Sequence, residues 1–142
     1  AGSYSLKKSF TEESFREVIN DDDIKDPFVI KKVLFCSGKI YFDLLDYKQK
    51  NNQHEVALVR LEQIHPLPVK QLDELHQQYA KATWFWVQEE PLNMGAASFL
   101  QMYLKSFNYG VISRQPSAST ATGYNKVHHQ EQAELVETAF QI

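Results

Sequence analysis

The chain has 142 residues, 43% hydrophobic and 13% aromatic, which is long enough to bury a core and favours a single domain. Its net charge of -3, from 15 basic and 18 acidic residues, excludes a broad positive surface, so we expect no nucleic-acid partner. Its one cysteine, Cys36, allows no internal disulfide, and no apolar run reaches the roughly 18 to 20 residues that cross a bilayer. We therefore expect a soluble protein from a reducing compartment, with no membrane partner and no targeting segment.

Residues 1–27 are predicted to form an extension ahead of a domain that spans residues 28–142. The opening Ala1-Gly2-Ser3 has the composition of a cloning remnant. The rest of the extension has weak periodicity and carries an acidic run, Asp21 to Asp23, which is typical of a solvated segment. We expect no more than one short element in it.

From residue 32 on, short apolar runs alternate with amphipathic segments. Strands are predicted at 32–36, 56–61, 83–87 and 111–113, and helices between Tyr41 and Asn51, over 69–80, from Ala96 to Phe107 and from Val127 to Phe140. Unbroken apolar strands that alternate with helices indicate parallel neighbours joined by crossovers. The sequence therefore predicts an α/β fold with three layers, in which helices cover both faces of a mainly parallel sheet.

Loops at the carboxyl ends of such strands are the expected place for a ligand. Lys39 lies in the first turn of a helix, where backbone N–H groups favour anions, although a plain surface lysine is the more common case. Arg114 precedes a loop rich in hydroxyls that could hold a phosphate or a carboxylate. Arg60 ends an otherwise apolar strand, and it could bind an anion near Lys70 or pair with Glu62 or Glu89.

The stretch Gln88-Glu89-Glu90-Pro91 places two carboxylates where a strand stops. Neighbours on a strand point to opposite faces, so the two are poor partners for a shared proton, and one could line a cleft while the other pairs. Asn93 could cap the following helix. These features favour structure or an interface over catalysis.

The usual parts of an active site are missing from the sequence. It contains no glycine-rich nucleotide or phosphate motif, no serine hydrolase elbow and no zinc protease motif. Cys36 ends a buried strand, where a thiol is most often inert. The histidine pair at 128 and 129 points in two directions on a helix, so a shared ion is not expected. We predict no catalytic, cofactor-binding or metal-binding residue.

Four blocks of the sequence resemble the carboxyl-terminal domain of the E1 component of 2-oxoglutarate dehydrogenase, and its sister 2-oxoadipate dehydrogenase E1 is similar enough to remain an alternative. The blocks are VLFCSGKIYFDLL, HEVALVRLEQIHPLP, WVQEEPLNMGAA and RQPSASTATGYNKVHHQEQAELV, within residues 28–141. The resemblance implies a transketolase C-terminal-like domain, inactive alone, of a larger oxidoreductase of the tricarboxylic acid cycle. That enzyme uses thiamine diphosphate and magnesium, which its other domains hold.

The resemblance also implies partners: the remaining E1 domains, a second subunit in a homodimer, and the E2 succinyltransferase of the multienzyme complex. Gln88, Glu89, Glu90 and Asn93 are the implied interface residues. The location is the cytoplasm in a bacterium or the mitochondrial matrix in a eukaryote.

Some members of the resembling family bind AMP or acetyl-CoA in this domain, which makes Arg60, Gln63 and Lys70 effector candidates, with Lys39 and Arg114 as further ones. Relatives carry more than one arginine where this chain has Val69-Lys70-Gln71, and this departure weakens the case for acetyl-CoA. A free-standing nucleotide or coenzyme A binding module is the alternative from another functional class.

Overall fold

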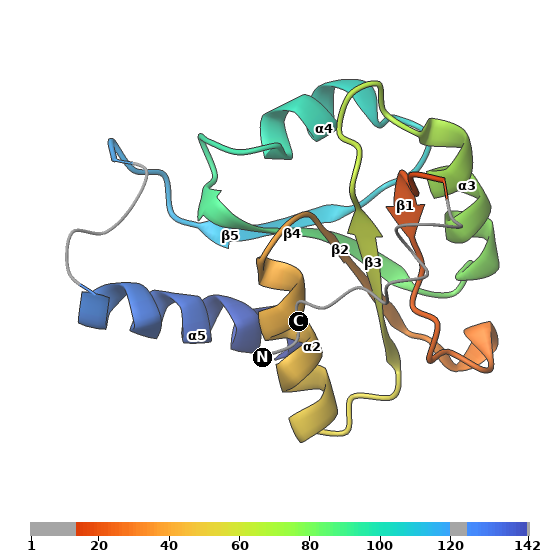
Figure 1. The fold of residues 1–142 in the computed structure, drawn as a ribbon, viewed down its shortest axis with the longest axis horizontal. Coiled ribbons are helices and arrows are strands. Elements are labelled where there is room, and N and C mark those ends of the chain that lie inside the picture. The colour runs from red at the N-terminus through yellow and green to blue at the C-terminus, as the bar shows by residue number, and fades with distance from the viewer. Residues whose placement is uncertain (1–13, 120–124, 142) are drawn as a thin grey trace.

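The computed structural model describes residues 14–119 and 125–141, which form one sheet with helices on both faces (Figure 1). The sheet has five strands in the order β1-β3-β2-β4-β5. The parallel strands are β2 (Lys32–Cys36), β3 (Val56–Leu61), β4 (Thr83–Pro91) and β5 (Gly110–Arg114). The short β1 (Val18–Ile19) pairs antiparallel with β3 at one edge.

The helices divide between the two faces of the sheet, as Figure 1 shows. Helices α2 (Ile40–Lys50) and α5 (Asn125–Gln141) cover one face, and α3 (Val69–Gln78) and α4 (Ala97–Tyr103) cover the other. A 3-10 turn, η1 (Pro27–Val29), precedes β2. The predicted α/β fold with three layers and a mainly parallel sheet is thereby confirmed.

The two faces have different cores because side chains alternate along each strand. On β2, Phe35 faces α3 and α4, where its ring meets those of Trp84, Trp86 and Tyr109 edge to face at 5.2 to 5.7 Å. Leu34 faces α2 and α5, within a core that is mainly aliphatic. Aromatic packing therefore stabilises one layer, and aliphatic packing the other.

The segment before residue 28 belongs to the sheet through β1 and through one buried carboxylate. Asp21 Oδ2 accepts hydrogen bonds from Lys48 Nζ (2.5 Å) and from the backbone N–H of Leu58 (3.0 Å). The Asp21 and Lys48 side chains are only 7% and 11% exposed. The prediction that the acidic run is solvated is therefore wrong for Asp21, which takes the place of a strand residue beside β3.

Two predicted boundaries differ from the structure by four residues, and several others differ by one or two. Strand β4 does not stop at Val87 but continues to Pro91, after a shift in its pairing register with β5. Helix α4 ends at Tyr103 rather than Phe107, because Leu104 takes an extended conformation. The apolar pattern continues beyond the helix because Phe107 is partly buried against the core, where its ring stacks on that of His76 at 4.3 Å between centres.

Helix α5 is fastened to the start of β2 by a lysine. Lys32 is buried, and its Nζ donates to the backbone oxygens of Ala139 (3.3 Å) and Phe140 (3.1 Å). A cation at a helix C-terminus satisfies carbonyls that have no partner within the helix. Burial lowers the pKa of Lys32, so this contact carries a desolvation cost. Within the described ranges, no helix is both long enough and apolar enough to cross a membrane.

Candidate functional site

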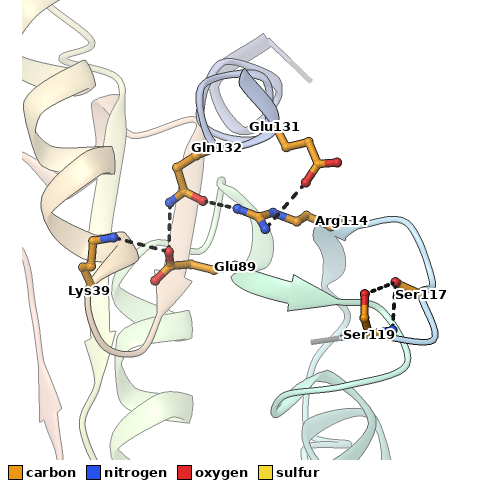
Figure 2. A network of polar contacts seen from close by, with 7 residues as sticks. All are labelled: Lys39, Glu89, Arg114, Ser117, Ser119, Glu131 and Gln132. Atoms are coloured by element: carbon orange, nitrogen blue, oxygen red, sulfur yellow. Dashed lines mark hydrogen bonds and ion pairs between the residues drawn. The ribbon is translucent and has the colours of Figure 1, made fainter. Parts of the chain in front are cut away.

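The loops that follow β2, β4 and β5 meet at one edge of the sheet, because these strands are parallel. The edge brings together two effector candidates, Lys39 and Arg114, with the interface candidate Glu89. Figure 2 shows a single chain of polar contacts that links them through Gln132 of α5. We call Lys39, Glu89, Gln132, Arg114 and Glu131 the polar network.

Gln132 is the centre of the polar network. Its Nε2 donates to Glu89 Oε2 (3.1 Å) and also to Asp43 Oδ2 of α2 (2.8 Å). Its Oε1 accepts from Nη2 of Arg114 (2.9 Å). One amide on α5 therefore connects α2, β4 and β5. Its nitrogen can only donate and its oxygen can only accept, so the nitrogen faces the two carboxylates and the oxygen faces the guanidinium.

The two cations of the network differ in how firmly they are held. Arg114 is 11% exposed and also lies 3.6 Å from a carboxylate oxygen of Glu131. Lys39 is 71% exposed, and its Nζ lies 3.9 Å from Glu89 Oε2. Arg114 is thus part of the packed structure, whereas Lys39 is an exposed charge at the rim, where water screens its pairing with Glu89.

A pocket of about 550 Å³ lies between β5 and α5, beside Arg114. Its lining includes Glu131 and Glu134 along with Arg114, and hydroxyls of Ser113, Ser117 and Ser119. Two carboxylates against one guanidinium disfavour a phosphate or carboxylate ligand. The predicted anion-binding role of Arg114 therefore has little electrostatic support here.

Gln88 is 3% exposed and makes only internal hydrogen bonds among those described. Its Nε2 donates to the backbone oxygens of Glu90 (3.3 Å), Pro91 (3.1 Å) and Met94 (2.7 Å). Its Oε1 accepts from Trp86 Nε1 and from the backbone N–H of Ala97, both at 2.9 Å. Gln88 thus holds the loop between β4 and α4 from inside and does not itself offer a surface for a partner.

Gly95 shows how closely this loop is packed. Its φ of +67° is one that side-chain-bearing residues rarely adopt, and a Cβ there would lie 3.0 Å from Gln88 Oε1. A glycine is required at this point for both reasons.

Asn93 does not cap α4, so that prediction is wrong. The capping position is Ala96, which has no side-chain hydrogen bond. The Asn93 amide instead exchanges two hydrogen bonds with the backbone of Ser117, one donated to its oxygen (2.9 Å) and one accepted from its N–H (3.0 Å). Asn93 therefore joins the loop after β4 to the loop after β5.

Glu89 and Glu90 point to opposite faces, as predicted from their places on a strand. Glu89 lies on the α2 and α5 face, in the polar network. Glu90 lies at a second pocket, of about 480 Å³, which we call the Glu90 pocket. It is lined by Ser37, Gly38, Ile64, Trp86, Gln88, Glu90, Gly95, Ala96 and Phe99.

Arg60, Gln63 and Lys70 do not form one site. Arg60 Nε donates to Glu62 (3.0 Å), and its guanidinium lies 4.7 Å from the ring centre of Tyr41 on α2. Lys70 lies exposed on α3, which covers the other face. The structure thus places Arg60 and Lys70 on different faces, and the predicted alternative, a pairing of Arg60 with Glu62, is found. Gln63 Nε2 donates to the backbone oxygen of Pro66 (2.7 Å).

Cys36 is fully buried, and this burial raises the pKa of its thiol from 9.0 to about 12, although the charge of Arg60 opposes the rise. A thiol with this pKa is protonated at neutral pH and is a poor nucleophile. In the described part of the chain, no three His, Cys, Asp or Glu side chains are placed to hold one metal ion.

Gln132, Glu131 and Asp43 are the residues of this site that were not predicted from the sequence. A signal for Gln132 was present: it precedes Leu135, Val136 and Ala139 by three, four and seven positions, so it lies on the buried stripe of α5. A polar residue on such a stripe needs a partner inside the fold.

Comparisons with known proteins agree on one family. The family model described as 2-oxoglutarate dehydrogenase C-terminal matches residues 4–140. The 2-oxoglutarate dehydrogenase E1 component of Haemophilus influenzae is 40% identical over 132 residues, which cover 89% of this chain and 14% of that protein. The oxoglutarate dehydrogenase of Buchnera aphidicola is 38% identical over 90% of this chain and 15% of its own length.

A third relative carries a different substrate in its name. The probable 2-oxoadipate dehydrogenase complex component E1 homolog of Dictyostelium discoideum is 39% identical over 89% of this chain and 15% of its own length. The chain thus spans about a seventh of the curated relatives that it matches.

Proposed function

This chain belongs to the 2-oxoglutarate dehydrogenase C-terminal family, and from that premise we propose that it works as the carboxyl-terminal structural and dimerisation domain of an E1 component. The observation that carries the proposal is the 40% identity to an E1 component over a stretch that makes up only 14% of that protein. The reaction proposed for the whole protein is the thiamine diphosphate-dependent decarboxylation of 2-oxoglutarate, with transfer of the succinyl group to an E2 partner in the tricarboxylic acid cycle.

The residues of this chain do not fit thiamine diphosphate with its magnesium ion. The sequence contains no Gly-Asp-Gly segment. Across the described residues, no cluster of three metal-ligating side chains occurs either. We therefore derive no chemical step here, and the proposal places the cofactor in other domains of the E1 protein, in the cytoplasm of a bacterium or the matrix of a mitochondrion.

The geometry supports a positioning role because the edge of the sheet is rigid. Gln88 and Asn93 fasten the end of β4, the loop after it and the start of α4 by six hydrogen bonds, four to Gln88 and two to Asn93. The loop can therefore present a fixed surface to a neighbouring domain with little loss of conformational entropy on docking.

A regulatory site for AMP or acetyl-CoA has less support. Arg60 and Lys70 lie on opposite faces, and Arg60 is already paired with Glu62. Lys39 is exposed but lies next to Glu89, whose charge repels a phosphate.

The 2-oxoadipate subfamily is a second candidate, because the identities of 40% and 39% do not separate the two substrates. A chimera tests the role of the domain, which the two subfamilies share, because the host E1 supplies the rest of the protein. This chain replaces the matching segment of the Haemophilus influenzae E1 component, and the truncated E1 without that segment is the control. We expect the chimera to be dimeric and to decarboxylate 2-oxoglutarate, and the truncated protein to be inactive.

A chimera that is folded but neither dimeric nor active contradicts the proposal. Thermal shifts of the chain itself with AMP and acetyl-CoA test the free-standing module. A saturable shift that is lost in Arg60→Ala or Lys70→Ala supports that module, since a ligand stabilises only the state that it binds.

A further inference from the structure

The Glu90 pocket lies at the point where the connections of the sheet change direction. After β2 the chain passes to α2 on one face, and after β4 it passes to α4 on the other face. Since β2 and β4 are neighbours, the loops that leave them separate and open a crevice between their carboxyl ends. Ser37 and Gly38 from the first loop and Gly95 and Ala96 from the second line this pocket.

The walls of the pocket combine hydrophobic side chains with the polar side chains of Ser37 and Gln88 and with one charge. Ile64, Trp86 and Phe99 supply hydrophobic surface. The amide of Gln88 is used by its five internal bonds, so it offers no group to a ligand. Gly38 has a φ of +75° and open space where a Cβ would stand, so no side chain narrows the entrance of the pocket on that side. The carboxylate of Glu90 is the only charged group among the lining residues.

Glu89 and Glu90 differ in whether their charge is matched. Glu89 accepts a hydrogen bond from Gln132 and lies near Lys39. The Glu90 side chain is exposed, and among the described residues it has no ion pair and no side-chain hydrogen bond. A partly apolar pocket with one unmatched carboxylate complements a group with an apolar stem and a cationic end.

We propose that the Glu90 pocket receives an arginine or lysine side chain from a part of the E1 protein outside this chain. The charged end pairs with Glu90, and the methylene stem packs on Phe99 and Ile64. This inference rests on the proposed function. The E1 component that this chain matches is much longer than the chain, which covers 14% of it, so the remaining domains can supply the cationic side chain. Glu90, rather than Glu89, is then the carboxylate that meets a partner.

Hydrogen–deuterium exchange on the chimera tests the pocket. Amide exchange should be about tenfold slower in the chimera than in the free chain for two segments, the one with Ser37 and Gly38 and the one with Gly95 and Ala96. The reason is that pairing of Glu90 with the incoming cation favours the docked arrangement by about this factor. Glu90→Gln should remove this protection, whereas the matched control Glu89→Gln should leave it in place. Equal exchange in the chimera and the free chain, or no effect of Glu90→Gln, would overturn the inference.

A second measurement needs no chimera. The free chain is titrated with N-acetyl-arginine methylamide while the amide signals of Gly38 and Gly95 and the indole signal of Trp86 are followed by NMR. We expect weak, saturable shifts that vanish in Glu90→Gln and persist in Glu89→Gln. No shift in the wild-type chain speaks against the pocket, and so does micromolar affinity, which would instead make it a site for a free organic cation.

The two proposals fail in different ways. An active, dimeric chimera without protection at these glycines leaves the proposed function standing and removes the pocket's role. An inactive chimera, together with a normal titration of the free chain, contradicts the E1 function and leaves the cationic specificity of the pocket intact.

Discussion

Gln88 and Glu89 are neighbours on one strand, and they represent two different ways to use a polar side chain. Gln88 points to the α3 and α4 face, where it is buried and makes five hydrogen bonds within one short stretch of chain. Glu89 points to the α2 and α5 face, where it belongs to a network that reaches from a packed arginine to an exposed lysine.

The difference shows which polar side chains are needed for the stability of the fold and which can be substituted at little cost. A buried amide that loses its partners leaves several backbone groups unsatisfied, and each of these costs free energy. A charge at the rim loses little, because water replaces its partner. We therefore expect substitutions to have a graded effect on stability, from the buried amide to the rim.

Replacing Gln88 should have the largest effect. Gln88→Leu removes a hydrogen bond from three backbone oxygens, of which Pro91 O keeps the N–H of Met94, and from the Trp86 indole and the Ala97 N–H, so we expect a loss of about 3 kcal/mol in the free energy of unfolding. Urea unfolding followed by tryptophan fluorescence measures it. Gln49→Leu, at an exposed position on α2, is the control and should change stability by less than about 0.5 kcal/mol. A loss below that level in Gln88→Leu would contradict the comparison.

The pH dependence of stability tests whether water is excluded from the core on the α2 and α5 face, where Cys36 lies, as it is from the core around Gln88. Its folded pKa of about 12 lies above the ordinary 9.0, so the unfolded chain releases its proton first. The protonated thiol therefore contributes to the free energy of unfolding. This contribution is complete below pH 9.0 and is lost as the pH rises toward 12, by about 1.4 kcal/mol per pH unit. Urea unfolding at pH 8, 9 and 10 should show a steeper decline for the wild type than for Cys36→Ala. Parallel curves would indicate that water reaches the thiol.

Arg114 lies between the two extremes. Arg114→Met leaves Gln132 Oε1 and Glu131 without this partner, so we expect a loss of about 2 kcal/mol and faster proteolysis near the start of α5. Glu89→Gln is the matched variant, because an amide oxygen can still accept from Gln132, and it should lose about 0.5 kcal/mol. Equal losses in the two variants would mean that the network acts as one unit.

Lys39 should matter least for stability. Its ammonium is 71% exposed and lies 3.9 Å from Glu89, so Lys39→Ala should change the free energy of unfolding by about 0.3 kcal/mol or less. The same difference measured in high salt should be smaller still. A loss above about 1 kcal/mol would place Lys39 with the packed residues instead.

The parallel core could be predicted because its signals are local. The strand over Val56 to Leu61 has the predicted bounds, because a short, unbroken apolar run between polar turns is typical of a buried parallel strand. Strand β1 was missed because it has two residues and is held by a distant partner, β3. The continuation of β4 to Pro91 was missed because a proline argues against a strand interior, and only the shifted register with β5 accommodates it.

The site was predicted in part. The opposite directions of Glu89 and Glu90 follow from strand geometry alone. The partner of Glu89 does not, because Gln132 lies 43 positions away and reaches it only when α5 docks. Asn93 was assigned to a helix cap for a similar reason: local rules favour a cap, while its true partner, Ser117, is 24 positions away.

The contact of Lys32 with α5 has a consequence for the order in which the protein forms. It joins residues 107 and 108 positions apart, so this contact can form only after α5 has been synthesised. During synthesis on the ribosome, all five strands emerge before α5 does. Val87 of β4 and Ile112 of β5 then lack the cover of this helix, so their apolar surface stays exposed until α5 docks.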